Sequence, residues 1–415
     1  MTAAALRPWQ AAGLAPAKAA AARPGRTLWS APTGCHARGA EVLRANGRPV
    51  KVEDVESGDR LAGDGMDVRV IDLLRGHQEM ARIRPTKGAP FVVNLDHVLT
   101  VVWTASDGAK KAGDLVDVSV REWLGWSATA KHLAKLVRRP AHWGDLAPGR
   151  YSIHPYLLGV LLGDGCFTAG GVVIANSAPE IAGSVTALLP AGLSVATRKV
   201  PSSGGGTKTR LAIVRDKRGR ADHPMVSALK DLGLRGLRAA EKFVPDDYLY
   251  RADQTSRAEL LAGLLDTDGH MTGSGYDWIS ASPRLAEGVT YIARALGLAA
   301  YVTASEKFCQ NGTGGTYWRV SISGDCSALP LRVPRKRAPR RSQKKDVLRT
   351  GFDVELLAAD DFYGFVADGD RRYLMADFTL THNCGKGTLQ LAALAAIPGA
   401  VLTTPSGEIA RGMLD

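Results

Sequence analysis

Short runs of the apolar residues that favour β-strands fill residues 40–99, and glycine or aspartate residues separate one run from the next. Residues 41–43, 68–71 and 91–93 are the clearest of these runs. Many short runs at close spacing with glycine and aspartate between them are typical of β-strands. The pattern therefore predicts an all-β unit of many short strands.

The pattern changes between about residue 154 and residue 330, where apolar runs at helical spacing alternate with strand-like runs. It predicts helices at residues 156–162, 258–265 and 285–296. Strand-like runs then return at residues 362–366, 373–375 and 378–380. We therefore expect one β domain that is split by an inserted α/β domain.

The composition is that of a globular chain, with 45% hydrophobic and 23% charged residues over 415 residues. This length predicts about two to three domains. No apolar run approaches the roughly 18 uncharged residues of a membrane span, so we expect no membrane partner. The cysteines are odd in number and form no CxxC pair, which disfavours a disulfide framework and a structural zinc: Cys35, Cys166, Cys309, Cys326 and Cys384. We expect a reducing, cytoplasmic location in a bacterial or phage-type host.

The net charge of +12 favours polyanionic partners, because lysine and arginine displace counterions from phosphates. The charge is concentrated in residues 332–345, which contain no acidic residue. The basic residues of this segment are Arg332, Arg335, Lys336, Arg337, Arg340, Arg341, Lys344 and Lys345. The segment is either a solvated linker or a linker that contacts DNA, and the sequence does not decide between them.

Two distant segments form one motif when the residues between them are removed. Residues 31–34 followed by residues 384–388 read Ala-Pro-Thr-Gly-Cys-Gly-Lys-Gly-Thr, a phosphate-binding loop. Gly34 and Gly385 would let backbone N–H groups approach a triphosphate, and Lys386 would neutralise it. We expect Thr388 to contact Mg²⁺ and the joined loop to bind ATP. Residues 35–383 interrupt this loop.

The start of the insert carries a residue that can react with its own peptide bond. The thiol of Cys35 can attack the carbonyl of Gly34, which has no side chain to shield it, and convert the amide to a thioester. This step needs a nearby proton donor, and the imidazole of His97 is the best candidate.

The end of the insert carries a second reactive group. The side-chain amide of Asn383 can attack its own carbonyl, form a succinimide and release the residues that follow. His382 lies beside it as the expected proton donor, and Cys384 supplies the thiol that receives the N-terminal segment. Splicing of this kind would need no cofactor.

These residues resemble the inteins along the whole insert: Cys35 to Leu43 with residues 52–59, Phe91 to Leu99, and Tyr373 to Cys384. The resemblance implies the horseshoe-like splicing fold shared with hedgehog autoprocessing domains, here formed by residues 35–145 and 346–383. The chain departs from the family at three positions. Asn94 stands where threonine is usual and could still hydrogen-bond to the scissile region, Gly364 stands near a usual acid or cysteine, and Arg372 stands near a usual histidine.

A second motif occurs twice, at residues 157–165 and 261–269. Each copy is a short apolar helix that ends in aspartate and glycine. Gly159 and Gly263 would permit close contact between the two helices, and Asp164 and Asp268 would then lie together. Two adjacent carboxylates repel each other unless a cation lies between them, so the repeat predicts a divalent metal site.

The repeated motif resembles the LAGLIDADG homing endonucleases, over residues 150–331. The resemblance implies that two similar halves grip a long double-stranded DNA site, the intein-less host gene, with β-strands in the major groove. Mg²⁺ on Asp164 and Asp268 would activate water for cleavage, and Lys242 would assist. The paired motifs imply a monomer. In the first copy Leu162 stands where a non-catalytic acid is frequent.

The flanks, residues 1–34 and 384–415, resemble superfamily 2 helicases of the DEAD/DEAH type. The resemblance implies fragments of a RecA-like α/β P-loop domain, in which Gln10 reads adenine and Lys386 binds the β- and γ-phosphates. No Asp-Glu-X-His box is present, so these flanks alone are not expected to hydrolyse ATP.

The leading hypothesis is a self-splicing protein with a DNA endonuclease, lodged in a helicase phosphate loop. A rival is a free-standing DNA-binding protein or ATPase in which the junction residues are coincidental. A third alternative is an insert whose splicing or endonuclease activity has decayed, which Gly364 and Arg372 keep open.

Overall fold

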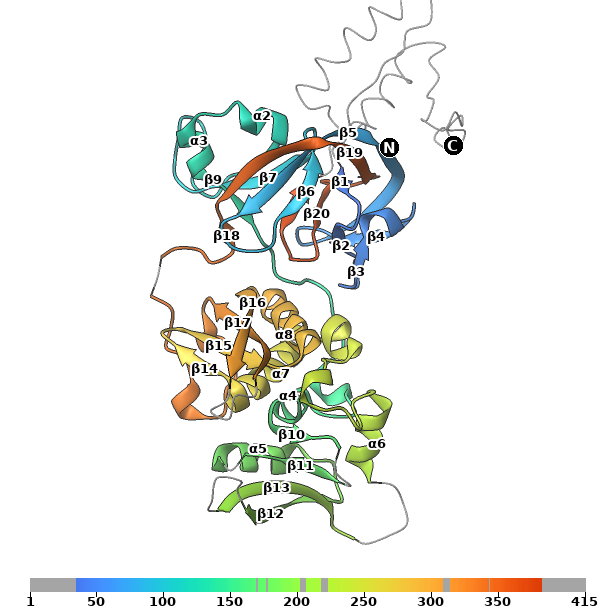
Figure 1. The fold of residues 1–415 in the computed structure, drawn as a ribbon, viewed down its shortest axis with the longest axis vertical. Helices are drawn as coiled ribbons and strands as arrows, with labels where there is room; N and C mark the ends of the chain where they lie inside the picture. Colours follow the sequence, from blue (N-terminus) through green and yellow to red (C-terminus); the bar gives the residue numbers. More distant parts are fainter. Residues whose placement is uncertain are drawn as a thin grey trace, which may run out of the picture. The chain divides into compact units, whose positions relative to one another are not determined.

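The computed structural model describes residues 35–168, 171–176, 178–201, 207–217, 223–308, 314–342 and 344–382. Within these ranges the chain forms two compact units (Figure 1). The first unit takes residues up to 137 and from 350 onward, and the second takes residues 138–349. The predicted site residues Gln10, Gly34, Asn383, Cys384, Gly385, Lys386 and Thr388 lie outside the described residues.

The first unit is built mainly from antiparallel strands. Its strands before the second unit are β1 (His36–Ala37), β2 (Glu41–Leu43), β3 (Pro49–Lys51), β4 (Arg60–Ala62), β5 (Asp67–Pro85), β6 (Phe91–Asn94), β7 (Val98–Trp103), β8 (Leu115–Ser119) and β9 (Ala134–Val137). Its later strands are β18 (Arg349–Thr350), β19 (Phe352–Ala367), β20 (Arg372–Leu374) and β21 (Leu380–His382). Two short helices, α2 (Val120–Leu124) and α3 (Ala128–Leu133), follow β8.

The early and late strands of the first unit pair with one another. One sheet has the order β19-β1-β6-β5-β4, and another has the order β18-β9-β7-β21-β20 with β8 added to β7. In Figure 1 the orange and red strands accordingly lie among blue and cyan ones. Each of these two sheets therefore combines strands from before and after the second unit, as the split β domain requires.

The prediction of uniformly short strands was wrong for β5 and β19. These strands have 19 and 16 residues and pair from Phe352↔Pro85 to Ala367↔Val70, with two register shifts. The polar middle of β5, around His77 and Gln78, hides the strand from a search for apolar alternation. Continuous backbone pairing satisfies its hydrogen bonds nonetheless.

The second unit contains two successive modules with one order of elements. The first consists of α4 (Pro155–Asp164), β10 (Gly165–Cys166), β11 (Val172–Ile174), α5 (Pro179–Leu188), β12 (Leu193–Pro201), β13 (Thr207–Arg215) and α6 (Pro224–Asp231). The second consists of α7 (Gln254–Asp268), β14 (His270–Thr272), β15 (Gly275–Ser280), α8 (Pro283–Ala295), β16 (Ala299–Phe308) and β17 (Gly314–Ser323). Their sheets have matching orders, β10-β11-β13-β12 and β14-β15-β17-β16. The paired motif is thus the start of a structural repeat.

Helices α4 and α7 lie in the core of the second unit, where Leu157, Leu161, Leu261 and Leu265 are fully buried. The segment predicted as a basic linker, residues 332–345, falls within this unit. Arg332 pairs with Glu259 at 2.9 Å, and its guanidinium lies 3.6 Å from the ring centroid of Tyr156. Among the described residues, no helix is both long and apolar enough to cross a membrane.

Candidate functional sites

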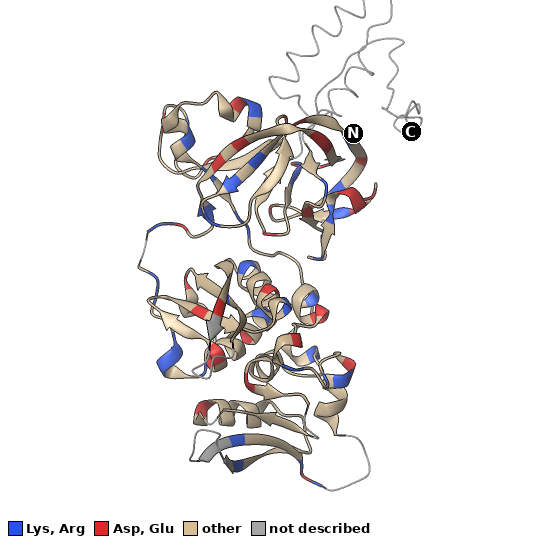
Figure 2. Cartoon of the chain, viewed as in Figure 1, with Lys and Arg blue, Asp and Glu red and all other residues tan. Residues whose placement is uncertain are grey.

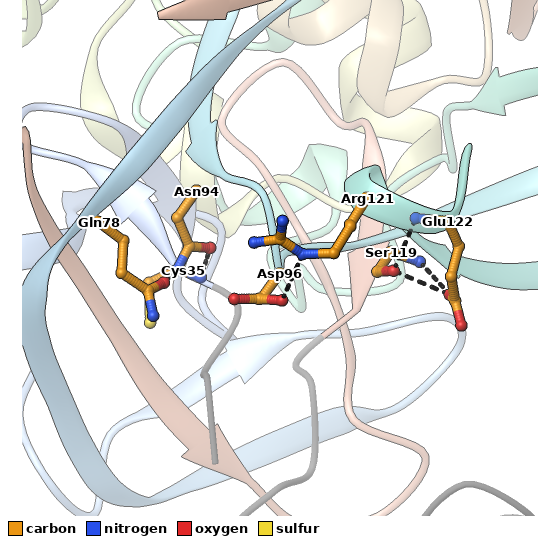
Figure 3. A network of polar contacts seen from close by, with 7 residues as sticks. All are labelled: Cys35, Gln78, Asn94, Asp96, Ser119, Arg121 and Glu122. Atoms are coloured by element: carbon orange, nitrogen blue, oxygen red, sulfur yellow. Dashed lines mark hydrogen bonds and ion pairs between the residues drawn. The ribbon is translucent and has the colours of Figure 1, made fainter. Parts of the chain in front are cut away.

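Cys35 is buried and is held by Asn94, the last residue of β6. The backbone N–H of Cys35 donates to Oδ1 of Asn94 at 2.9 Å, and the N–H of Asn94 donates to the carbonyl of Cys35 at 3.0 Å. The amide nitrogen of Asn94 donates in turn to Oε1 of Gln78 at 2.7 Å (Figure 3). Gln78 thus fixes which way the amide of Asn94 points. The sequence did not single out Gln78, because it lies in the polar middle of β5.

Gly364 lies directly against the thiol of Cys35. Strand β1 pairs with β19 at His36↔Tyr363, which brings residue 364 beside the junction cysteine. A Cβ at Gly364 would overlap Sγ of Cys35 and would lie 2.9 Å from its Cβ. The side chain of Cys35 therefore occupies the space in which an acid or cysteine at residue 364, usual near this position in the family, would place its own side chain.

Two buried histidines pack beside the junction. The ring of His97 lies 4.6 Å from that of His36, centroid to centroid, and Nε2 of His97 is 2.7 Å from the hydroxyl of Thr381. Burial holds the pKa of His97 well below its usual range, and the nearby charges of His36 and His382 lower it further. Burial also lowers the pKa of His36 to about 4. Both imidazoles are therefore neutral at physiological pH.

Strand β21 brings the end of the insert to the same place. Thr381 pairs with Leu99 and His382 with Val98, so the buried His382 lies beside the segment that contains His97. The first and last described residues of the insert thus flank residues 94–98. The predicted residues Cys35, Asn94, His97 and His382 are brought together; Asn383 and Cys384 lie outside the described part of the chain.

Asp117 and Arg372 form an ion pair near His382. Nη2 of Arg372 lies 3.0 Å from Oδ2 of Asp117, and the hydroxyl of Thr100 donates to Oδ1 of Asp117 at 2.8 Å. Burial raises the pKa of Asp117, but the charge of His382 and the hydrogen bond and charge of Arg372 outweigh it, so the pKa is below its usual value. The sequence showed Arg372 only as a departure from the family and gave no signal for Asp117.

The second site lies where α4 and α7 end. A Cβ on Gly159 would lie well under 3.0 Å from the carbonyl oxygen of Leu260, and one on Gly263 equally close to that of Tyr156. The two glycines therefore permit the close helix contact that the sequence predicted. A Cβ on Gly163 would likewise fall 2.9 Å from Oδ2 of Asp268, so the second aspartate reaches the end of α4.

Both aspartates have raised pKa values. Burial raises the pKa of Asp164. The pKa of Asp268 is raised to about 6, first by burial and then by the charge of Asp164. The amide of Asn176 donates to Oδ2 of Asp164 at 2.6 Å. Two carboxylates that resist ionisation together favour a cation between them. Among the described residues, no group of three or more acidic, histidine or cysteine side chains gathers as a metal cage.

Lys242 caps helix α4 from within the core. Its ammonium donates to carbonyl oxygens at 2.8–3.3 Å, those of Leu161, Leu162, Gly163 and Gly165. Burial lowers the pKa of Lys242 to about 8, although Asp268 and Asp164 oppose the shift. The lysine is therefore placed at the end of the helix that carries Asp164.

Lys336 occupies the equivalent place at the end of α7. Its ammonium donates to carbonyl oxygens at 2.7–3.1 Å, those of Leu265, Asp266 and Thr267. Burial lowers its pKa as well. The sequence assigned Lys336 to the basic segment and missed this role. A weak signal existed, since Val-Pro lies beside both lysines, at residues 244–245 and 333–334.

A match to a known family covers part of the second unit. Residues 255–331 match the model of the LAGLIDADG-like domain. The match begins in α7 and includes Asp268 and the whole second module. It confirms the LAGLIDADG resemblance for this module, and the shared topology extends the same architecture to the first.

Two curated proteins are similar to parts of the chain. The replicative DNA helicase DnaB of Mycobacterium intracellulare is 32% identical over 131 residues, which are 32% of this chain and 16% of that protein. The catalytic subunit of the V-type proton ATPase of Candida tropicalis is 20% identical over an alignment that covers 86% of this chain and 44% of that protein. The chain thus spans less than half the length of each relative.

Solved structures with similar parts fall into two groups. The gp41-1 intein shares 11% identity, with 26% of this chain and 69% of that chain covered and a TM-score of 0.19. I-DmoI in complex with DNA and Ca shares 14% identity, with 45% and 95% covered and a TM-score of 0.29.

The chain therefore carries a LAGLIDADG-like domain between the two parts of a β unit. By its junction residues and its paired motifs it resembles the inteins that hold a LAGLIDADG homing endonuclease, and it is similar over part of its length to a replicative helicase.

Proposed function

We propose that residues 35–383 excise themselves from the chain and join the flanking segments, and that their second unit cuts double-stranded DNA. The observation that carries the splicing proposal is the convergence of Cys35 and His382 on residues 94–98. A reaction that couples two junctions requires this meeting of distant ends.

The N-terminal step falls to Cys35, Asn94 and His97. The hydrogen bond from the Cys35 N–H to Asn94 orients the amide at the scissile junction, in the place of the threonine usual in the family. The neutral His97, bonded to Thr381, can take up or deliver a proton during thioester formation. At the other junction His382 would assist cyclisation of Asn383, and Cys384 would accept the transferred segment.

The endonuclease proposal places a divalent cation, Mg²⁺, between Asp164 and Asp268. Burial raises the pKa of both carboxylates, and the charge of Asp164 raises that of Asp268 further, which fits a cation because a positive charge relieves this repulsion. When bound, the metal supplies an activated water for phosphodiester cleavage. Lys242 and Lys336 lie at the same helix ends and are suited to stabilise the charge that develops on the phosphate.

The sheet of the first module is suited to bind a phosphate backbone. Arg198 of β12 lies directly opposite Arg210 of β13, and both are exposed. Like charges in this arrangement destabilise a bare sheet, and a polyanion relieves the repulsion. Figure 2 shows blue Lys and Arg positions along these strands. We propose that the DNA partner lies against this sheet and its counterpart in the second module, and that a single chain suffices for binding.

The host assignment rests on the sequence and on the helicase similarity. The joined loop with Gly34, Gly385, Lys386 and Thr388 would bind ATP and Mg²⁺ in a helicase-like protein, and Gln10 would read adenine. We propose that splicing restores this loop in a reducing cytoplasm, where neither junction cysteine would be oxidised to a disulfide.

Mass spectrometry of the expressed chain tests the splicing proposal. We expect the 44.0 kDa precursor to give residues 35–383 and a ligated product of residues 1–34 and 384–415. The Cys35→Ala and Asn383→Ala double variant should remain at the precursor mass. An unaltered chain that also persists at 44.0 kDa would overturn the proposal.

Incubation with Mg²⁺ and a plasmid that carries the uninterrupted junction tests the endonuclease proposal. We expect a double-strand cut that requires metal and is lost in Asp164→Asn and Asp268→Asn. Cutting should weaken as the pH falls through about 6, since protonation of Asp268 competes with the metal. Binding without any cut would reduce the unit to a DNA-binding domain.

A further inference from the structure

Three polar side chains share one face of the six-stranded sheet in the described part of the first unit. In register, His382 of β21 pairs with Arg372 of β20 on one side and with Val98 of β7 on the other. Thr100 follows two residues after Val98 and pairs with Asp117 of β8. Since directly paired residues and residues two apart point to the same face, Asp117, His382 and Arg372 all lie on it.

The ion pair between Asp117 and Arg372 spans the strand that carries His382. Strands β7 and β21 lie between β8 and β20, so the two side chains meet above them. Nη2 and Nε of Arg372 lie 3.0 and 3.4 Å from the carboxylate oxygens of Asp117. The side chain of Arg372 is 22% exposed and that of Asp117 is 13% exposed. With the Thr100 hydroxyl also donating at 2.8 Å, the carboxylate has one fixed position.

The fixed carboxylate lies within electrostatic reach of His382. The charge of His382 is the largest of the influences that lower the pKa of Asp117. The attraction is mutual, so an ionised Asp117 stabilises a protonated His382. His97 lies on the other side with a neutral ring, because burial holds its pKa well below the usual range and the charges of His36 and His382 add to this shift.

We propose that Asp117 is a positioning residue for the C-terminal step: its negative charge acts on His382 from the same face of the sheet, while Arg372 and Thr100 fix the Asp117 carboxylate. The inference rests on the proposed splicing function. In that step the side-chain nitrogen of Asn383 bonds to its own carbonyl carbon, and the bond from that carbon to the nitrogen of Cys384 breaks. One proton leaves the side-chain amide and one ends on the freed α-amine, so protonated His382 is the donor that Asp117 supports.

The structure thus assigns Asp117 as the acid that replaces the one missing near Gly364, and Arg372 as the residue that holds this acid. Gly364 cannot carry an acid because Cys35 fills its place, and Arg372 cannot donate and regain a proton as histidine does. The acid comes instead from β8, and the arginine serves to hold it.

The test measures the two junctions separately in the full chain. Added thiol cleaves the thioester at Cys35 and reports the N-terminal step, and release of the residues after Asn383 reports the C-terminal step. We expect Asp117→Asn to slow C-terminal release at least about tenfold and to leave thiol cleavage unchanged. Asp117→Glu should restore part of the rate, and the exposed Asp114→Asn should behave as the unaltered chain.

Combining Asp117→Asn with His382→Ala separates positioning from a general effect. If Asp117 acts through His382, the double variant should be no slower at the C-terminal junction than His382→Ala alone. Additive losses, or equal loss at both junctions in Asp117→Asn, would overturn the assignment. An unaltered chain without thiol cleavage or C-terminal release would instead overturn the splicing proposal itself.

Discussion

At the scale of single residues, the site around Cys35 depends on the absence of a side chain at Gly364. The thiol of Cys35 occupies the space where a side chain of residue 364 would lie, so the packing here requires glycine. Asn94 shows a complementary solution, because its amide replaces a hydroxyl and needs Gln78 to keep its orientation. Around this cluster the ion pair of Asp96 with Arg121 and the Ser119–Glu122 capping box fix the start of α2 (Figure 3).

The substitution Gly364→Ala tests this packing requirement. The new methyl would overlap the side chain of Cys35, which is fully buried. We expect thiol cleavage at Cys35 to fall by roughly tenfold or more, as for a nucleophile displaced by about 1 Å. Gly125→Ala is the matched control, because its Cβ would meet only an ordinary contact at 3.6 Å. Unchanged cleavage would show that Cys35 can react from another position.

At the scale of elements, the helix pair α4 and α7 sets the separation of the aspartates. Gly159 and Gly263 each face the backbone of the partner helix. A side chain at either position would overlap a backbone carbonyl oxygen of that helix. Lysines 242 and 336 then satisfy the carbonyl groups that a helix end leaves without partners. Asp266, the counterpart of Leu162, accepts the N–H of Arg332 at 2.7 Å and the hydroxyl of Tyr156 at 2.8 Å.

Gly263→Ala should destabilise the second unit. Its methyl would overlap the Tyr156 carbonyl, and overpacking of this kind costs about 1–3 kcal/mol in the free energy of unfolding. Gly183→Ala in α5 is the control, since a Cβ there meets nothing within 4 Å; removal of a helical glycine should stabilise by up to about 1 kcal/mol. Urea unfolding measures both values. Equal effects of the two substitutions would contradict the close helix contact.

Sequence reasoning succeeded where a motif and a periodic pattern coincided. The helices at 156–162, 258–265 and 285–296 and the convergence of Cys35, His97 and His382 agree with the structure. It failed where backbone pairing or side chains from distant strands decide the outcome. The polar middle of β5 obscured that strand and Gln78, and Asp117 reaches its site only through the order of β8, β7, β21 and β20.

At the scale of the whole molecule, the chain consists of two units with separate cores. Strand β9 ends at Val137 and pairs in one sheet with β18, which ends at Thr350. The two crossing points between the units therefore lie side by side, as the backbone hydrogen bond of 2.9 Å from Arg138 to Leu348 also indicates. An inserted unit with adjacent ends disturbs its host little.

Removal of residues 138–349, with a short Gly/Ser linker from Val137 to Thr350, should leave both junction cleavages intact. The first unit contains every described residue that we assign to splicing. Thiol cleavage and mass spectrometry measure the outcome, and the same deletion with Cys35→Ala is the control. Loss of cleavage in the shortened chain would mean that the second unit contributes to the splicing site.

The pairing of β5 with β19 also governs when the chain can react during its synthesis. The ribosome makes β1, β5 and β6 first, then the entire second unit, and only afterwards β19 and β21. Until those last strands emerge, Thr381 and His382 do not lie beside His97, and the strand that carries Gly364 does not yet pack against the thiol of Cys35. If residues 35–383 splice as proposed, this order of synthesis keeps the nascent chain from severing its first segment before the acceptor segment exists.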